Sequence, residues 1–243
     1  MSLTDEEAFL TLHADIPRQG PGLPEDVHWA LDVLEVGRAA RILDAGCGPG
    51  ADLETLAEAR PMARIEGIEQ ILHLAGEARE RLRHFTNVEV MTGDMGALSG
   101  FYDFIWSAGA IYFLGVTEGL QLWRQSLALG GAIAFSEPVL AADAPKAAKE
   151  FWAEYPQITD YGGLQERVEA AGFEVVGHRP LSTAAWAAYY MPLAARVARL
   201  RAGADPELAP VLAEAEREIM LWRAAPDHVR YELMLVRPAM GPS

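Results

Sequence analysis

The chain has 243 residues, and its 35 acidic residues against 20 Lys and Arg give a formal net charge of −15. Binding to nucleic acids or anionic membranes through counterion release needs a basic face, so this composition argues against both partners. The single cysteine excludes an intramolecular disulfide and leaves too few thiolates for a cysteine-based metal site. The acidic start of the chain and the lack of an apolar run of roughly 18 residues predict a cytoplasmic protein without a membrane span.

About forty residues precede the first expected strand. They contain a Pro- and Gly-rich stretch over 17–24 and a helical pattern over 25–35. We interpret residues 1–40 as a helical flap in which the coil over 15–24 covers a pocket. A simple linker is the alternative for that coil, because Pro- and Gly-rich connections are common in proteins.

Short apolar runs then alternate with segments of helical period. Strands are expected over 41–45, 63–68, 88–91, 104–107 and 132–136, and helices over 53–60, 71–85 and 118–129. Strands joined by helices of crossover length form a parallel sheet with helices on both faces, so this region predicts an α/β fold.

The rhythm changes after Pro138. Helices are expected over 145–155, 163–171 and, as a consecutive pair, 183–223, and strands over 173–177 and 229–236. Asp205 and Pro206 are typical of the N-cap and first position of a helix. No helix follows the final strand, which is therefore expected to run antiparallel. We expect one domain, a core over 41–243 with lid helices inserted near 139–160 and 183–224.

The run ILDAGCGPGAD at 42–52 follows the first expected strand and opens a helix. Its three alternating glycines lack Cβ atoms, so the chain can turn sharply and a ligand can lie against backbone amides at a helix N-terminus. The run also satisfies the dinucleotide pattern G-x-G-x-x-G/A, and Glu69 lies near the distance at which that fold places a ribose-binding acid. The glycines alone thus permit two different cofactors.

Acidic residues end the first three expected strands. Asp44 could attract an ammonium group, and Glu69 could accept hydrogen bonds from ribose hydroxyls. Asp94 could accept from an adenine amine while the Met95 thioether covers the ring. Three carboxylates at one sheet edge suit a cationic adenosine ligand better than a ligand with two phosphates.

With these motifs the chain resembles the class I S-adenosylmethionine-dependent methyltransferases of the small-molecule type, the methyltransferase-11/25-like group. The resemblance covers 41–138 by motif. It implies a Rossmann-like, seven-stranded, mostly parallel sheet, S-adenosyl-L-methionine as cofactor and methyl transfer to a small-molecule acceptor. It also implies a set of cofactor-binding residues: Gln19, Asp44, Gly46, Cys47, Gly48, Gly50, Glu69, Gln70, Gly93, Asp94, Met95, Ser107 and Ala108.

The acceptor side carries weaker signals. In-line methyl transfer gains much of its acceleration from orientation, so a general base is optional. Glu137, at the end of the fifth expected strand, is the best candidate for a base or an acceptor-binding group, against a role in a loop or an ion pair. Tyr112 could orient the acceptor or simply pack under a loop. The aromatic residues of the expected lids, including Tyr155 and Tyr189, are more often core.

The six histidines show no metal-ligand spacing, so we interpret all of them as structural and expect a metal-independent reaction. The fourth strand end lacks the Asn/Asp-Pro-Pro-Tyr/Phe sequence of enzymes that methylate nucleobases. Two alternatives stay open: an NAD-dependent oxidoreductase that uses the same glycine loop, and a non-catalytic S-adenosylmethionine-binding module. The acceptor and the oligomeric state also stay open.

Overall fold

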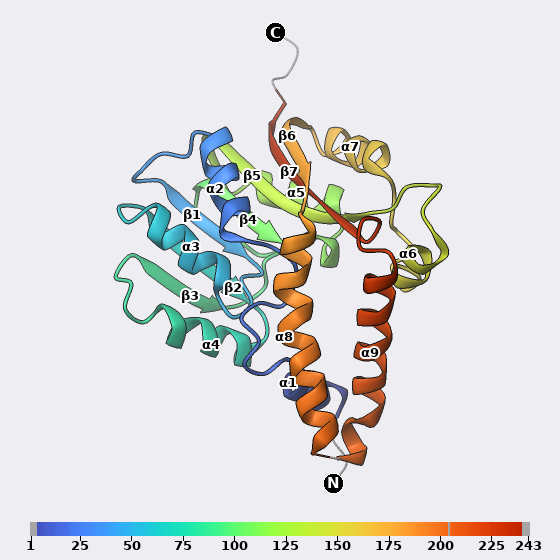
Figure 1. The fold of residues 1–243 in the computed structure, drawn as a ribbon. Coiled ribbons are helices and arrows are strands. Elements are labelled where there is room, and N and C mark those ends of the chain that lie inside the picture. Colours follow the sequence, from blue (N-terminus) through green and yellow to red (C-terminus); the bar gives the residue numbers. More distant parts are fainter. Residues whose placement is uncertain (1–3, 204, 240–243) are drawn as a thin grey trace.

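The computed structural model describes residues 4–203 and 205–239 (Figure 1). It contains a seven-stranded sheet of order β3-β2-β1-β4-β5-β7-β6. The strands are β1 Arg41–Ala45, β2 Arg64–Glu69, β3 Val88–Thr92, β4 Tyr102–Ala108, β5 Leu127–Val139, β6 Phe173–Pro180 and β7 Arg230–Pro238. Strands β1 to β5 pair in parallel, and β7 lies antiparallel between β5 and β6. The predicted mostly parallel α/β sheet with an antiparallel last strand is confirmed.

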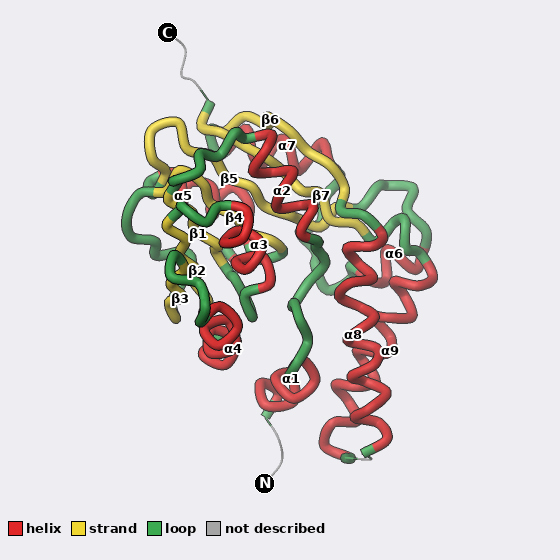
Figure 2. The backbone as a smooth tube through the Cα atoms, turned by 60° about the vertical axis from the view of Figure 1, so that its left-hand side comes forward, coloured by secondary structure: helices red, strands yellow, loops and turns green. Residues whose placement is uncertain are grey.

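Helices cover both faces of this sheet (Figures 1 and 2). The helices are α1 Asp5–His13, α2 Pro24–Val33, α3 Ala51–Ala59, α4 Leu72–Leu82, α5 Val116–Arg124, α6 Lys146–Phe151, α7 Tyr161–Ala170, α8 Thr183–Ala202 and α9 Ala209–Ala224, with short 3₁₀ helices η1 Ile111–Phe113 and η2 Pro206–Leu208. Among the described residues, none of these helices combines the length and the apolar character that crossing a membrane requires.

Two buried apolar clusters form the core, one on each face of the sheet. Neighbouring strand residues alternate between them: Phe104 belongs to the cluster under α2 and α3, and Ile105 to the cluster under α5 and α7. Since side chains of a strand point alternately to opposite faces, a strand covered on both sides reads as a continuous apolar run. This explains why β1 and β4 are recognisable in the sequence.

Two element boundaries differ from expectation after β4. The predicted helix over 118–129 ends at Arg124, and β5 begins at Leu127 instead of near residue 132. The Tyr102 amide donates to the Ser126 carbonyl at 2.8 Å, which starts the pairing of β4 with β5 early. Tertiary strand pairing here overrides the helical propensity of Leu and Ala.

Helix α1 and the turn before α9 also differ from the predictions. The Thr4 hydroxyl and the Glu7 side chain cap α1 reciprocally, a capping box that the sequence contains but that our sequence interpretation missed. Asp205 was expected to start an α-helix, but it caps the 3₁₀ helix η2, and α9 begins at Ala209.

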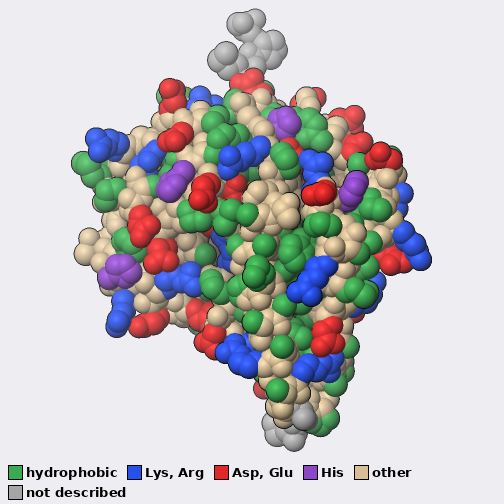
Figure 3. Space-filling view, in the orientation of Figure 1, with side chains coloured by type: hydrophobic (Ala, Val, Ile, Leu, Met, Phe, Trp, Pro, Cys, Tyr) green, Lys and Arg blue, Asp and Glu red, His purple; other side chains and the backbone are tan. Residues whose placement is uncertain are grey.

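Helices α8 and α9 form a long antiparallel hairpin that extends beyond the sheet, with α1 packed beside it (Figures 1 and 2). The Arg196 guanidinium donates to the Thr11 carbonyl at 2.8 Å and thereby ties α8 to α1. On the face shown in Figure 3, basic side chains are scattered among acidic ones. The hairpin and α1 together enclose space next to the carboxyl ends of the strands.

Candidate functional site

A cavity of about 750 Å³ lies at the carboxyl ends of β1, β2 and β4 and continues to α1, α8, α9 and β7. Ligands of open α/β sheets bind at this edge, in the crevice outside the carboxyl ends of the strands. The volume is within the range of roughly 300–1,000 Å³ that small-molecule sites occupy. We call its two parts the loop end, beside the glycine loop 46–50, and the helix end, beside α1, α8 and α9.

The glycine loop has a backbone that only glycine adopts readily. Gly46 has a φ of +81°, and a Cβ atom there would lie 2.6 Å from the Cβ of Ala110. The amides of Gly46 and Cys47 donate to the Ile68 carbonyl at 2.9 and 3.1 Å, which fixes the loop to β2. Gly46 therefore lies close against Ala110, the residue before η1, and the start of α3 lines the cavity.

Glu69 connects the end of β2 to this loop. Its two carboxylate oxygens accept hydrogen bonds from the Gly48 amide at 2.9 Å and the Ile71 amide at 2.8 Å. The side chain is 9% exposed and lines the cavity. Because a carboxylate oxygen has two lone pairs, both oxygens keep capacity for a ligand hydroxyl.

Asp44 is the most unusual charge of the loop end. It is buried, it lines the cavity, and its Oδ2 has no hydrogen-bond partner in the part of the chain that the structure describes. Burial raises the pKa of Asp44 well above its ordinary range, Asp52 and Glu69 raise it further, and Arg18 opposes the rise. A desolvated carboxylate beside two others is costly unless a cationic ligand compensates it.

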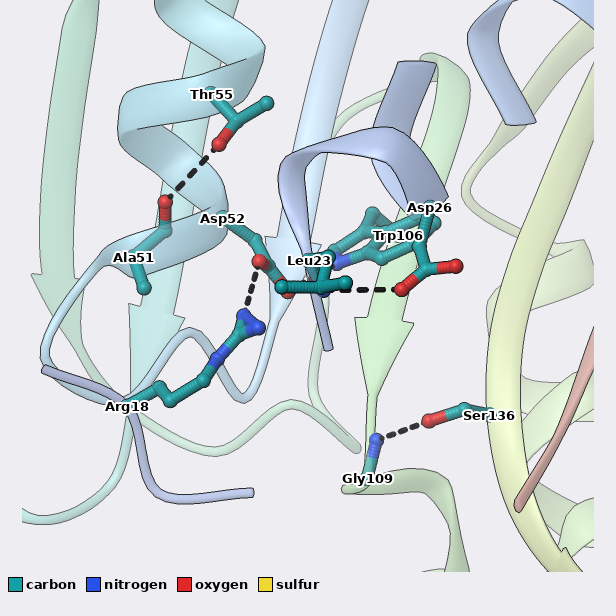
Figure 4. A network of polar contacts seen from close by, with 9 residues as sticks. All are labelled: Arg18, Leu23, Asp26, Ala51, Asp52, Thr55, Trp106, Gly109 and Ser136. Atoms are coloured by element: carbon teal, nitrogen blue, oxygen red, sulfur yellow. Dashed lines mark hydrogen bonds and ion pairs between the residues drawn. The ribbon is translucent and has the colours of Figure 1, made fainter. Parts of the chain in front are cut away.

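Arg18 fastens the coil between α1 and α2 to α3, as Figure 4 shows. Its guanidinium forms an ion pair with Asp52 Oδ1, and Trp106 Nε1 donates to Asp52 Oδ2 at 3.0 Å. Both Asp52 oxygens are therefore held at the N-terminus of α3, where the helix dipole favours a carboxylate. Residues 18–21 follow this contact along the cavity wall.

Most predicted site residues meet at this cavity. Its lining contains Gln19, Asp44, Gly46, Cys47, Gly48, Glu69, Gln70, Gly93, Met95, Ala108 and Tyr112. Parallel strands deliver their carboxyl ends to one edge of a sheet, which is why residues far apart in sequence gather here.

The remaining predicted residues lie next to the cavity without belonging to the described residues that line it. Gly50 packs against α4. The exposed Asp94 accepts from the Gly96 amide at 2.7 Å. The Ser107 hydroxyl is fully buried and donates to the Ala45 carbonyl at 2.9 Å, so it joins β4 to β1.

Glu137 lies one layer behind the wall. It is fully buried, and its Oε1 accepts a 2.6 Å hydrogen bond from the Tyr155 hydroxyl. Burial raises the pKa of Glu137 to about 7. The Tyr155 ring stands edge-on to Tyr112, with ring centroids 5.9 Å apart, and Tyr112 lines the cavity together with Tyr231. Glu137 thus holds Tyr155, which packs against one wall tyrosine, Tyr112.

The helix end contains residues that the sequence interpretation did not assign to a site. They are Phe9, Leu12 and His13 from α1, Tyr189 and Leu193 from α8, Val211, Glu214, Ala215 and Glu218 from α9, and Tyr231 from β7. Spacing of four residues places Glu214 and Glu218 on one helix face. The spacing does not predict which other element packs against this face of the helix.

His13 is nine-tenths buried at this end and is held in one tautomer. Its Nδ1 lies 3.0 Å from the Phe9 carbonyl, which can only accept, so we assign the proton to this nitrogen. Its Nε2 lies 3.4 Å from the Tyr189 hydroxyl. Burial lowers the pKa of His13, so the imidazole is neutral at neutral pH. Across the described residues, no group of three or more His, Cys, Asp or Glu is arranged to hold a metal ion.

Part of the chain is similar to known proteins. Residues 42–131 match the model of a methyltransferase domain. Over 141 residues the chain is 28% identical to trans-aconitate 2-methyltransferase from Delftia acidovorans. This match covers 56% of this chain and 52% of that protein. Over 69 residues the chain is 42% identical to a 37.1 kDa protein in a transposon of Streptomyces fradiae. This second match covers 28% of this chain and 20% of that protein. The matched segments thus span between a fifth and about half of these relatives.

Solved structures resemble the chain over nearly its whole length. An S-adenosylmethionine-dependent methyltransferase from Geobacter sulfurreducens, in complex with S-adenosyl-L-homocysteine, has a TM-score of 0.83 at 22% identity and covers 98% of this chain and 100% of its own. A second such enzyme from Thiobacillus denitrificans, with the same ligand, gives the same values. At this identity the likeness establishes a common fold.

Proposed function

We propose that the chain is a class I S-adenosylmethionine-dependent methyltransferase that transfers a methyl group from S-adenosyl-L-methionine to a small molecule bound at the helix end of the cavity. The observation that carries the proposal is Asp44 Oδ2, a buried carboxylate oxygen at the loop end that has no hydrogen-bond partner among the described residues. A cofactor with an ammonium group and a positive sulfur supplies the missing charge. When bound, it presents a methyl group that a nucleophile can take in one displacement.

Three residues of the loop end would hold this cofactor. Asp44 would bind the ammonium group, directly or through water, and Glu69 would accept from the ribose hydroxyls with the lone pairs that its two backbone contacts leave available. Met95 lines the cavity with its sulfur beside Gly46, where a thioether suits the face of an adenine ring. Gly93 and the exposed Asp94 follow β3 at the same edge.

The chain accelerates the reaction chiefly by orientation. Because positive charge on sulfur disappears during the displacement, the protein has to hold the acceptor in line with the methyl group, and no metal is needed for that. Tyr112 and Tyr231 line the wall that faces the acceptor, and Leu12 and Leu193 exclude water from it. Glu137 is a positioning residue that acts on this wall through Tyr155.

The first test is calorimetric titration of the protein with S-adenosylhomocysteine and, separately, with NAD. We expect binding of S-adenosylhomocysteine only. Glu69→Ala should weaken it by about tenfold or more, which corresponds to about 1.4 kcal/mol. Glu89→Ala is the matched control, because Glu89 is exposed on the neighbouring strand β3 and should leave the affinity unchanged.

Each other outcome contradicts a stated part of the proposal. Binding of NAD without S-adenosylhomocysteine would identify an oxidoreductase that uses the same glycine loop. A normal affinity in Glu69→Ala would overturn the ribose assignment. Binding of S-adenosylhomocysteine without product from a panel of amines, phenols, carboxylic acids and thiols would identify a non-catalytic binding module.

A further inference from the structure

The helix end of the cavity contains a cluster that we call the tyrosine pocket, defined as Tyr112, Tyr189, Tyr231, Glu218 and His13. All five residues line the cavity, and they come from η1, α8, β7, α9 and α1. The pocket is therefore assembled from five separate segments. We place the acceptor there, because a cofactor held by Asp44 and Glu69 would occupy the loop end.

Negative charge dominates this cavity. Of the described residues that line it, Arg18 alone is an Arg or Lys, and it is paired with Asp52 at the loop end. His13 is neutral because burial lowers its pKa. Glu218 and Glu214 both belong to the lining of the helix end. An anionic acceptor would therefore meet carboxylates there and no side-chain cation, which is unfavourable in a partly desolvated site.

Glu218 interacts electrostatically with all three tyrosines of the tyrosine pocket. Its Oε1 accepts a 2.6 Å hydrogen bond from the Tyr190 hydroxyl, and the described part of the chain offers this carboxylate no second hydrogen bond. Burial raises the pKa of Glu218, and no basic side chain of the described residues lowers it. Burial raises the pKa of Tyr112, Tyr189 and Tyr231, and the charge of Glu218 raises it further. One cation beside Glu218 would offset the negative charge that contributes to all of these shifts.

The surroundings of Glu218 suit an organic cation in particular. Tyr189 lines the cavity beside the buried Tyr190, with ring centroids 4.9 Å apart, and an aromatic ring attracts a cation through its face. Leu12, Leu193 and Val211 line the same end and offer an apolar surface to the rest of the molecule. A hydrated metal ion would gain nothing from such a surface, whereas an amine with an apolar body would.

We propose that the methyl acceptor is an amphipathic molecule with a protonated amino group, which Glu218 recognises within the tyrosine pocket. This inference rests on the proposed function, because it names the chemical class of the acceptor. The ammonium group donates to Glu218, its charge lies against the tyrosine rings, and its apolar part packs on the leucines of α1 and α8. Carboxylic acids are excluded by the same charges.

The test measures binding of matched probes by calorimetry in the presence of saturating S-adenosylhomocysteine. The probes are 2-phenylethylamine, the neutral 2-phenylethanol, the anionic 3-phenylpropionate and trans-aconitate, the compound in the name of the relatives. We expect the amine to bind about tenfold or more tighter than the alcohol, and neither anion to bind measurably. This comparison uses the unmodified protein and depends on no variant.

A substitution at Glu218 tests whether this side chain causes the preference for the amine over the alcohol. Glu218→Gln keeps the side-chain volume and an acceptor for the Tyr190 hydroxyl, so it removes mainly the charge. It should weaken amine binding about tenfold and leave the alcohol unchanged. Glu216→Gln is the control, since Glu216 is exposed on the same helix and pairs with Arg201. Thermal melting of both variants checks that they fold.

Three results would overturn the inference: an anion that binds as tightly as the amine, an equal loss of amine and alcohol affinity in Glu218→Gln, or no binding of the amine by a protein that binds S-adenosylhomocysteine. Failure of the unmodified protein to bind S-adenosylhomocysteine is a different result. It would count against the proposed function itself.

Discussion

The Tyr155 hydroxyl donates a 2.6 Å hydrogen bond to Oε1 of Glu137, while the other oxygen of this fully buried carboxyl group has no partner within the described residues. Glu137 lies on β5, and Tyr155 follows α6, so the contact joins the segment after β5 back to the sheet. It lies directly behind Tyr112 of the cavity wall. A buried carboxyl group that accepts only one hydrogen bond makes the free energy of unfolding depend on pH.

Glu137 makes the stability of the protein depend on pH. Its pKa of about 7 in the folded state is above its ordinary value of 4.5, so the folded protein binds this proton more tightly than the unfolded chain does. The resulting stabilisation is complete below pH 4.5 and is lost as the pH rises through 7. Over that window it amounts to roughly 3 kcal/mol.

Urea denaturation of Glu137→Gln between pH 4.5 and 8.5 measures this contribution. The free energy of unfolding should fall less with rising pH in the variant than in the unmodified protein. Tyr155→Phe removes a donor that lowers the pKa of Glu137, so it should move the loss to higher pH. The exposed Glu89→Gln serves as control. Parallel pH profiles for Glu137→Gln and the unmodified protein would refute the prediction.

Gly46→Ala should destabilise the protein and impair cofactor binding. The new Cβ would lie 2.6 Å from that of Ala110, at a backbone φ of +81°. The combined strain and clash should lower the free energy of unfolding by about 1–3 kcal/mol. Gly37→Ala is the control, because Gly37 is exposed and has no atom near an added Cβ.

Denaturation and calorimetry with S-adenosylhomocysteine check both effects of Gly46→Ala. Adding Ala110→Gly removes the opposing Cβ and should restore part of the lost stability. The backbone strain remains, so recovery should be incomplete. Equal stability of Gly46→Ala and Gly37→Ala would show that the loop tolerates a side chain.

Arg18→Gln should speed the release of S-adenosylhomocysteine. The variant removes the ion pair with Asp52 that holds the coil over residues 18–21 against the cavity. Both partners are largely buried, so the dissociation rate should rise about fivefold or more. Stopped-flow fluorescence would follow the release, with the exposed Arg38→Gln as control. If the coil does not cover the ligand, Arg18→Gln will release it at the unmodified rate.

A second substitution separates this ion pair from general damage. Asp52→Asn should raise the dissociation rate by a similar factor, and the double variant should be little worse than either single one, because both remove one interaction. Additive effects would mean that Arg18 and Asp52 act independently.

Local sequence patterns were sufficient to predict the sheet and the loop end of the cavity. The apolar runs of β1 and β4 are continuous because both faces of the sheet are covered, and this pattern survives in any short window of the sequence. Asp44 follows Ile42 and Leu43 within β1, and Glu69 is the last residue of β2. Since parallel strands end at one edge, strand order was not needed to bring them together.

Tertiary packing determines which residues come together at the helix end of the cavity. His13 and Tyr189 lie 176 positions apart and meet only because α1 packs beside α8. Glu218 shares its helical spacing with many exposed residues. Glu137 at a strand end looked like a wall residue, although it is fully buried against Tyr155 and is not among the described residues that line the cavity. Periodicity fixes which residues share a helix face or a strand end. The partner of that face depends on the angles at which helices and strands pack, which arise from the whole set of buried contacts.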